Sequence, residues 1–130
     1  MIVASAHGGM EIEDLAKSDL NSLRRMTIDP AVGPSESRAR ELAFQLGLKG
    51  GQIAQMATIL RACYLAYRDL DAVMAEINLL VITGTGDLVA LDAKISFDTN
   101  ALFRRPEIAG LRDRSQEYPS ESTAGDHGLA

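Results

Sequence analysis

The chain has 130 residues, of which 46% are apolar, so its length and composition predict one domain, or part of one, with a hydrophobic core. The 18 acidic and 13 basic residues give a formal net charge of −5, which argues against a nucleic-acid partner because such sites depend on Lys and Arg. One cysteine excludes an internal disulfide, no apolar run approaches the roughly 20 residues that span a membrane, and residues 1–5 lack signal-peptide features. We therefore expect a soluble, intracellular type of chain without a membrane partner.

The N-terminal region is expected to contain short elements separated by turns. Residues 2–5 predict a strand, and the paired glycines within residues 7–9 predict a turn. Acidic residues at the start of residues 11–17, with apolar residues on one side, predict a short helix. Residues 26–28 precede an Asp29-Pro30 turn and are expected to form an edge strand.

Two longer helices are predicted in the middle of the chain. Ser35 or Ser37 is expected to cap the first, which ends at Gly47 and has an apolar side made of Ala39, Leu42, Ala43 and Leu46. The second carries apolar residues at helical spacing, namely Ile53, Met56, Ala57, Leu60, Tyr64 and Tyr67. Cys63 lies beside this stripe and has no basic neighbour to lower its pKa, so we interpret it as a small buried hydrophobic residue.

From residue 75 onward the apolar period changes to two, which is typical of strands. Two strands, at residues 75–83 and 88–95, flank Gly84-Thr85-Gly86 and predict a β-hairpin. A three-residue loop pairs Thr83 with Asp87. A two-residue loop would shift the register by one residue and scatter the polar side chains over both faces.

The register of the three-residue loop places polar side chains on one face of the hairpin. Asn78 then lies opposite Asp92, and Glu76 opposite Lys94, while the other face holds Ile77, Leu79, Val81, Val89, Leu91, Ala93 and Ile95. Opposed Cβ atoms are about 4.5–5.5 Å apart, so the Asn78 amide and the Asp92 carboxylate can share one cation. Mg²⁺ prefers such oxygens together with substrate phosphates. The alternative is a solvated sheet face, on which Glu76 and Lys94 form a surface ion pair worth about 0–1 kcal/mol.

The C-terminal region is expected to contain a short helical segment and a tail. Asn100 is a candidate cap for a helical segment that Pro106 restarts or kinks. Residues 119–130 combine proline, glycine and small polar residues and are expected to be loosely ordered.

These segments resemble the β subunit of succinate–CoA ligase (succinyl-CoA synthetase). The similarity is most specific in the hairpin region, which contains EINLLVIT (76–83), GDL (86–88), LDAK (91–94) and NALFR (100–104). Further matches occur in the same order at GGMEIE (8–13), RELAF (40–44), LRD (111–113) and SQE (115–117). The related β subunit of malate–CoA ligase shares most of these motifs.

The resemblance implies an α+β fold, the second lobe of an ATP-grasp domain, in which an antiparallel sheet packs against helices. It assigns residues 1–118 to this partial ATP-grasp domain, its C-terminal lobe. It assigns residues 119–130 to a loosely ordered tail that leads to a CoA-ligase domain with no counterpart in this chain. The family's phosphate-covering and adenine-binding segments likewise have no counterpart.

The resemblance also implies roles for three residues. Asn78 and Asp92 match the two protein ligands of the nucleotide's Mg²⁺. Glu76, the candidate catalytic residue, matches the acid that helps to orient a phosphorylatable histidine of the partner α subunit. In the implied reaction ATP phosphorylates that histidine and leaves as ADP, the phosphate passes to succinate, and CoA then displaces the phosphate to give succinyl-CoA. The implied location is the bacterial cytoplasm.

The sequence departs from the family pattern at one position, and two alternative functions remain open. Leu79 stands where the family usually has proline, which changes the local strand geometry but not the ligand chemistry. The acid substrate is malate in one alternative. In the other, the chain is a non-catalytic interaction module that binds an α-type subunit. The isolated chain is expected to be inactive as a ligase, because the reacting histidine belongs to another subunit.

Overall fold

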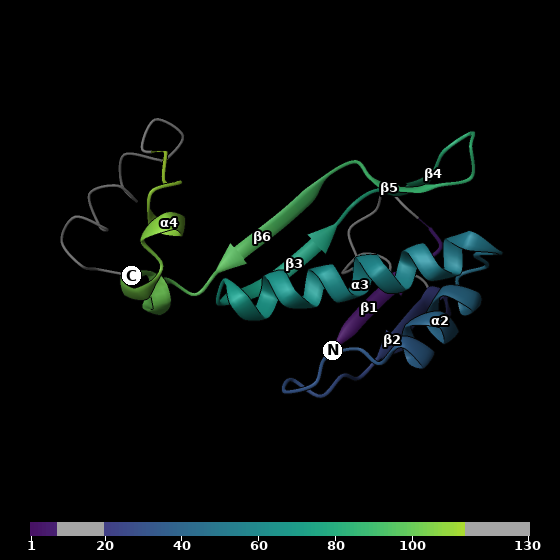
Figure 1. The fold of residues 1–130 in the computed structure, drawn as a ribbon, viewed down its shortest axis with the longest axis horizontal. Coiled ribbons are helices and arrows are strands. Elements are labelled where there is room, and N and C mark those ends of the chain that lie inside the picture. Colours follow the sequence, from purple (N-terminus) through teal and green to yellow (C-terminus); the bar gives the residue numbers. More distant parts are fainter. Residues whose placement is uncertain (8–19, 114–130) are drawn as a thin grey trace. The chain divides into compact units, whose positions relative to one another are not determined.

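The computed structural model describes residues 1–7 and 20–113 of the chain (Figure 1). Two compact units, Met1–Phe97 and Asp98–Ala130, divide the chain. The helix predicted at residues 11–17 and the tail predicted at residues 119–130 lie outside the described residues, as does the predicted domain boundary. Among the helices that are described, none combines the length and apolar character needed to cross a bilayer.

The strands of the first unit form three antiparallel two-stranded ribbons. The first pairs β1 (Ile2–Ser5) with β2 (Leu23–Met26), which follows a 3₁₀ turn at Leu20–Ser22. The second pairs β3 (Ala72–Ile77) with β6 (Ala93–Phe97), and the third pairs β4 (Leu80–Ile82) with β5 (Leu88–Ala90). Helices and antiparallel strands therefore share one unit, as the α+β prediction requires.

The first ribbon confirms one predicted strand and corrects another. β1 spans the four residues predicted from the sequence. β2 ends at Met26, so the strand predicted at residues 26–28 was placed too late. The carbonyl of Thr27 accepts a hydrogen bond from Arg38 Nη1 at 3.1 Å, so a helix side chain, rather than a neighbouring strand, binds the backbone there.

The helix α2 (Glu36–Gln45) confirms the predicted cap and apolar side. Ser35 is its N-cap, and the Ser35 hydroxyl accepts a hydrogen bond from Arg38 N at 3.4 Å. The helix ends at Gln45, with Leu46 as its C-cap just before Gly47, and it buries the apolar residues Ala39, Leu42 and Ala43.

The helix α3 (Gly51–Asp69) confirms the longer predicted helix. It buries Met56, Leu60 and Tyr64, whereas Tyr67 at the end of the predicted stripe remains 46% exposed. Cys63 is half-buried, and burial raises the pKa of its thiol despite a backbone hydrogen bond that lowers it. A raised thiol pKa fits the interpretation of Cys63 as a hydrophobic residue rather than a reactive one.

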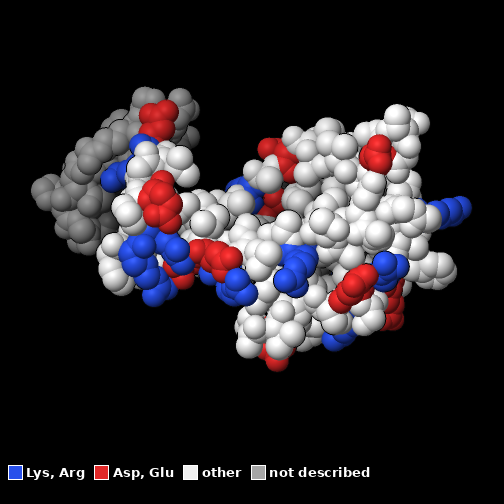
Figure 2. Space-filling model, viewed as in Figure 1, with Lys and Arg blue, Asp and Glu red and all other residues white. Residues whose placement is uncertain are grey.

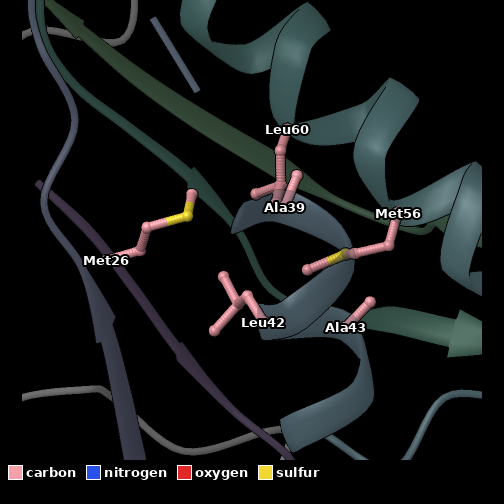
Figure 3. Packing of buried hydrophobic residues seen from close by; sticks show 6 residues of the cluster. All are labelled: Met26, Ala39, Leu42, Ala43, Met56 and Leu60. Carbon is pink, nitrogen blue, oxygen red and sulfur yellow. The ribbon is translucent and has the colours of Figure 1, made fainter. Parts of the chain in front are cut away.

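The core lies where the two helices meet β2. Figure 3 shows side chains from all three elements pointing toward one another, namely Met26, Ala39, Leu42, Ala43, Met56 and Leu60. Partly buried residues of β1, Ile2 and Ala4, pack against this cluster, as do Leu80 of β4 and Leu88 of β5. The third ribbon is thus tied to the core through one residue from each strand.

A tight turn before α2 closes against α3. Asp29 accepts a hydrogen bond from Gly33 N at its carbonyl (2.8 Å), and its side chain accepts one from Ala31 N (2.8 Å). The Tyr64 hydroxyl donates to the carbonyl of Pro30 at 2.8 Å. Gly33 has a φ of +84°, and a Cβ added there would lie 2.5 Å from Tyr64 Cε1, so the turn and the aromatic ring need glycine at this position.

Acidic and basic side chains are interspersed on the surface of the first unit (Figure 2). On α2, Arg40 Nε lies 3.0 Å from Glu36 Oε1, one helical turn away. At the end of α3, Arg68 Nε lies 2.6 Å from Asp69 Oδ1, and its guanidinium lies 5.5 Å from the Tyr64 ring centroid. The side chains of both pairs are about half-exposed or more, so each pair contributes little to stability.

The second unit begins with a 3₁₀-helix, η2 (Thr99–Arg104), followed by α4 (Pro106–Ala109). Pro106 opens α4, which confirms that it restarts the helical segment. The cap is Asp98 rather than the predicted Asn100. The Asp98 carboxylate accepts hydrogen bonds from Asn100 N at 2.9 Å and from Asn100 Nδ2 at 3.2 Å, and the helical turn begins two residues earlier than expected.

Candidate functional site

The hairpin has the register that the three-residue loop predicts. Glu76 lies opposite Lys94 in the β3–β6 ribbon, and Val81 lies opposite Val89 in the β4–β5 ribbon. Thr83 N donates to the carbonyl of Asp87 at 2.9 Å, which closes the loop at the predicted pair. Gly86, the last loop residue, has a φ of +89°, the left-handed conformation that such loops require at this position.

The strands are less continuous than predicted. Each predicted strand is interrupted between its two ribbons, at residues 78–79 on one side and 91–92 on the other. Asn78 N donates to the carbonyl of Asp92 at 3.3 Å, and Leu91 N donates to the carbonyl of Leu79 at 2.9 Å. These two bonds carry the register across the interruption. The Asn78–Leu79 peptide bond is cis.

The candidate metal ligands therefore lie opposite each other at the junction of two ribbons. Asn78 is half-buried, and Asp92 is exposed. Their backbones are directly paired, as predicted, whereas the sharing of a cation by their side chains stays a prediction. Both offer oxygen donors, an amide and a carboxylate, and this donor set fits a hard cation such as Mg²⁺.

Glu76 and Asn78 also belong to the wall of a cleft of about 670 Å³. Glu76 is half-buried, while Lys94 opposite it is exposed. Neither Asp92 nor Lys94 belongs to the cleft wall. In the described part of the chain, no three His, Cys, Asp or Glu side chains gather into a metal-binding cluster.

The apolar face of the hairpin is more exposed than the alternation predicts. Three apolar residues that follow the loop have exposed fractions of 41%, 62% and 37%, namely Val89, Leu91 and Ile95. Ile77 and Leu79, which lie on the same face before the loop, are half-buried. The pattern of alternation is therefore right, but the described residues cover only part of the apolar face.

Two glutamines that the sequence analysis missed fasten the loop to α3. Gln52 Nε2 donates to the carbonyl of Gly86 at 3.2 Å. Gln55 donates from Nε2 to Asp87 Oδ1 at 2.8 Å and accepts at Oε1 from Leu88 N at 2.7 Å. Their spacing of three residues near the start of a mostly apolar helix was the available signal. This glutamine clamp (Gln52 and Gln55) positions the loop that sets the hairpin register.

The clamp also affects the charge of the loop. The hydrogen bond from Gln55, followed in importance by one from the Thr85 hydroxyl at 2.9 Å, holds the pKa of Asp87 below its usual value. Asp87 is exposed, so this is a local effect. A carboxyl with a lowered folded-state pKa adds stability above its ordinary pKa, and this contribution is lost as the pH falls through the folded-state value.

We expect the substitution Gln55→Ala to raise the pKa of Asp87 toward its ordinary value, because its strongest donor is removed. The matched control is Gln52→Ala, which removes the neighbouring clamp residue without touching Asp87. Carbon-detected NMR titration of the Asp87 carboxyl measures both variants. Equal midpoints in the wild-type chain and in Gln55→Ala would contradict the assigned cause.

Comparison with known proteins supports the fold and the site region. The ATP-grasp domain family matches residues 1–82, which include Glu76 and Asn78. The probable malate–CoA ligase subunit beta of Mesorhizobium japonicum is 56% identical over 130 residues, which are 100% of this chain and 33% of that protein. The succinate–CoA ligase [ADP-forming] subunit beta of Paramagnetospirillum magneticum is 48% identical over 128 residues (98% and 32%), and that of Acidiphilium cryptum is 47% identical over 129 residues (99% and 32%).

The chain spans about a third of the length of these curated relatives. The family match covers more than half of the chain, and the described residues have the expected mixture of helices and antiparallel strands. The chain belongs to the ATP-grasp domain family.

Proposed function

We propose that this chain contributes the magnesium side of the nucleotide site in the β subunit of an ADP-forming acid–CoA ligase. The observation that carries the proposal is the pairing of Asn78 with Asp92 across the hairpin, at 3.3 Å between backbone N and O. The match to the ATP-grasp domain and the names of the relatives support the same activity.

Asn78 and Asp92 would hold the Mg²⁺ that accompanies ATP or ADP, through the amide oxygen and the carboxylate. When bound, the ion neutralises charge on the phosphates. Asn78 lies half-buried at the junction of β3 and β4, which limits its freedom to move, whereas Asp92 is open to solvent and accessible to an incoming nucleotide.

Glu76 would act on a different group. Glu76 lies two residues before Asn78 in the sequence and points to the same side in the predicted alternation, and this half-buried residue lines the cleft. We propose that it orients a histidine of a partner α subunit, which receives the phosphoryl group. A carboxylate that accepts a hydrogen bond from one ring nitrogen of a histidine fixes the tautomer of the imidazole and leaves the other nitrogen to react.

The acid substrate is proposed to be a four-carbon dicarboxylate. The relatives are named for succinate and for malate, which share this chemistry. The proposed reaction joins the acid to CoA at the expense of ATP, in the bacterial cytoplasm.

The metal assignment can be tested on this chain alone. Adding Mn²⁺ to the ¹⁵N-labelled chain, with and without ADP, should broaden amide signals by proximity to the bound ion. We expect the broadening to be strongest at Asn78 and Asp92, to weaken with distance along both strands, and to be reversed by excess Mg²⁺. Broadening centred on any other acidic residue, or an equal effect at all exposed carboxylates, would contradict the proposed site.

A further inference from the structure

The two candidate metal ligands lie at the joint between two β-ribbons. Residues 78–79 and 91–92 separate the β3–β6 ribbon from the β4–β5 ribbon, and Asn78 and Asp92 belong to this joint. The backbone N–H of Asn78 donates to the carbonyl of Asp92 at 3.3 Å. Because the joint connects the two ribbons, the position of one ribbon relative to the other affects the distance between the two ligand side chains.

The β4–β5 ribbon needs support from the rest of the first unit. Each of its strands has three residues, and an isolated two-stranded hairpin is marginally stable at best in water. Leu80 and Leu88 pack against the core, while Ile82 and Val89 are 53% and 41% exposed. The position of this ribbon therefore depends on its contacts with other elements.

Gln55 binds a backbone group that points away from the hairpin. Thr83 N donates to the carbonyl of Asp87 at 2.9 Å, which makes these residues a hydrogen-bonded pair. In the next pair, Ile82 with Leu88, the N–H groups then point away from the partner strand. Gln55 Oε1 accepts a hydrogen bond from Leu88 N at 2.7 Å, and its Nε2 donates to Asp87 Oδ1 at 2.8 Å. One side-chain amide thus binds two consecutive residues that follow the loop.

The helix α3 links this attachment to the first ribbon. It contacts both β3 and β5 (Figure 1). With 19 residues it is a rod about 28 Å long. Gln52, about one turn before Gln55, adds a second attachment, because it donates to the carbonyl of Gly86 at 3.2 Å. A hairpin that is bound to the start of α3 cannot turn about the joint without breaking these bonds.

We infer that Gln55 is a positioning residue for the metal site, which holds the β4–β5 ribbon at the angle that keeps Asp92 opposite Asn78. It acts through the backbone of the ribbon, because Leu88, to which it binds, lies about 13 Å along the strand from Asp92. The inference about the joint depends on the described contacts alone, whereas its consequence for Mg²⁺ rests on the proposed function.

An exchange of polar groups between positions 55 and 87 tests this role. Gln55→Glu keeps an acceptor for Leu88 N but places a carboxylate against the Asp87 carboxylate, so repulsion opens the clamp. Asp87→Asn alone keeps an acceptor for Gln55 and should have little effect. The double variant restores the pair with donor and acceptor exchanged. The matched control is Gln45→Glu, which places a carboxylate beside Glu41 on α2.

The joint and the metal site are measured separately in the full 130-residue chain. In Gln55→Glu the Asn78 and Leu91 amides should exchange their hydrogens about tenfold faster, and Mn²⁺ affinity from amide broadening should fall about tenfold, because the hydrogen bonds of the clamp are lost. The double variant should restore both values, and Gln45→Glu should change neither. Amide spectra show whether each variant is folded. Affinity is measured on the folded chain, so a loss of global stability alone does not change it.

Unchanged exchange of the Asn78 amide in Gln55→Glu would overturn the inference, as would a double variant that behaves like Gln55→Glu. Faster exchange with unchanged Mn²⁺ affinity would also overturn it, because Gln55 would then hold the hairpin without positioning the ligands. If Mn²⁺ does not bind at Asn78 and Asp92 in the wild-type chain, the proposed function fails. The exchange rates and their recovery in the double variant then still decide whether Gln55 holds the joint.

Discussion

Replacing Asp92 by Asn should weaken Mn²⁺ or Mg²⁺ binding to the chain at least tenfold, or about 1.4 kcal/mol. The carboxylate is the only formal negative charge among the two proposed protein ligands, and an amide oxygen is a weaker ligand for a hard cation. Asp92 is exposed, so the substitution should leave the fold unchanged. Mn²⁺ broadening of the amide signals measures the affinity, and the unperturbed signals report the fold.

Two neighbouring variants make this prediction specific. Lys94→Ala removes an exposed cation two residues after Asp92 in the sequence and should leave cation binding unchanged or slightly tighter. Glu76→Gln neutralises the acid opposite Lys94 and should leave the affinity nearly intact, because Glu76 is assigned to the partner's histidine. If Glu76→Gln weakened binding as much as Asp92→Asn, the roles proposed for these two carboxylates would be wrong.

The parts that could be predicted from sequence depend on local chemistry. The hairpin register follows from the length of the loop between Thr83 and Asp87, because strand alternation then determines every later pair, including Glu76 with Lys94. The first long helix follows from Ser35 as its cap and from an apolar spacing of three and four. The resemblance to the ATP-grasp family, which rests on the hairpin motifs, is confirmed by the family match.

The parts that could not be predicted depend on contacts between distant segments. Gln55 reaches Asp87 and Leu88, 32 and 33 residues away, and no local pattern specifies that meeting. β2 ends just before Thr27, whose carbonyl accepts a hydrogen bond from Arg38, 11 residues later. The apolar period of two continues through residues 78–79 and 91–92, although the pairing of the strands is interrupted there. The sequence pattern therefore could not show the interruption.

The turn at Gly33 gives the largest expected effect on stability. Gly33→Ala should lower the free energy of unfolding by about 2–5 kcal/mol, through two additive causes. A left-handed φ of +84° costs an alanine about 1–2 kcal/mol. The added methyl group would also lie 2.5–2.9 Å from three atoms of the Tyr64 ring, and overpacking of this kind costs typically 1–3 kcal/mol. The ring has little room to move, since its hydroxyl binds Pro30 and its face is buried.

Gly47→Ala is the matched control for this substitution. Gly47 has the same φ of +84°, but nothing lies within 4 Å of a Cβ added there, so the control isolates the backbone cost of about 1–2 kcal/mol. Urea unfolding followed by circular dichroism gives both values, and their difference is the steric cost at Tyr64. Equal losses for the two variants would mean that the Tyr64 ring moves aside at no cost. A larger loss for Gly33→Ala would show that the turn and α3 are packed together as tightly as the 2.8 Å bond between Tyr64 and Pro30 implies.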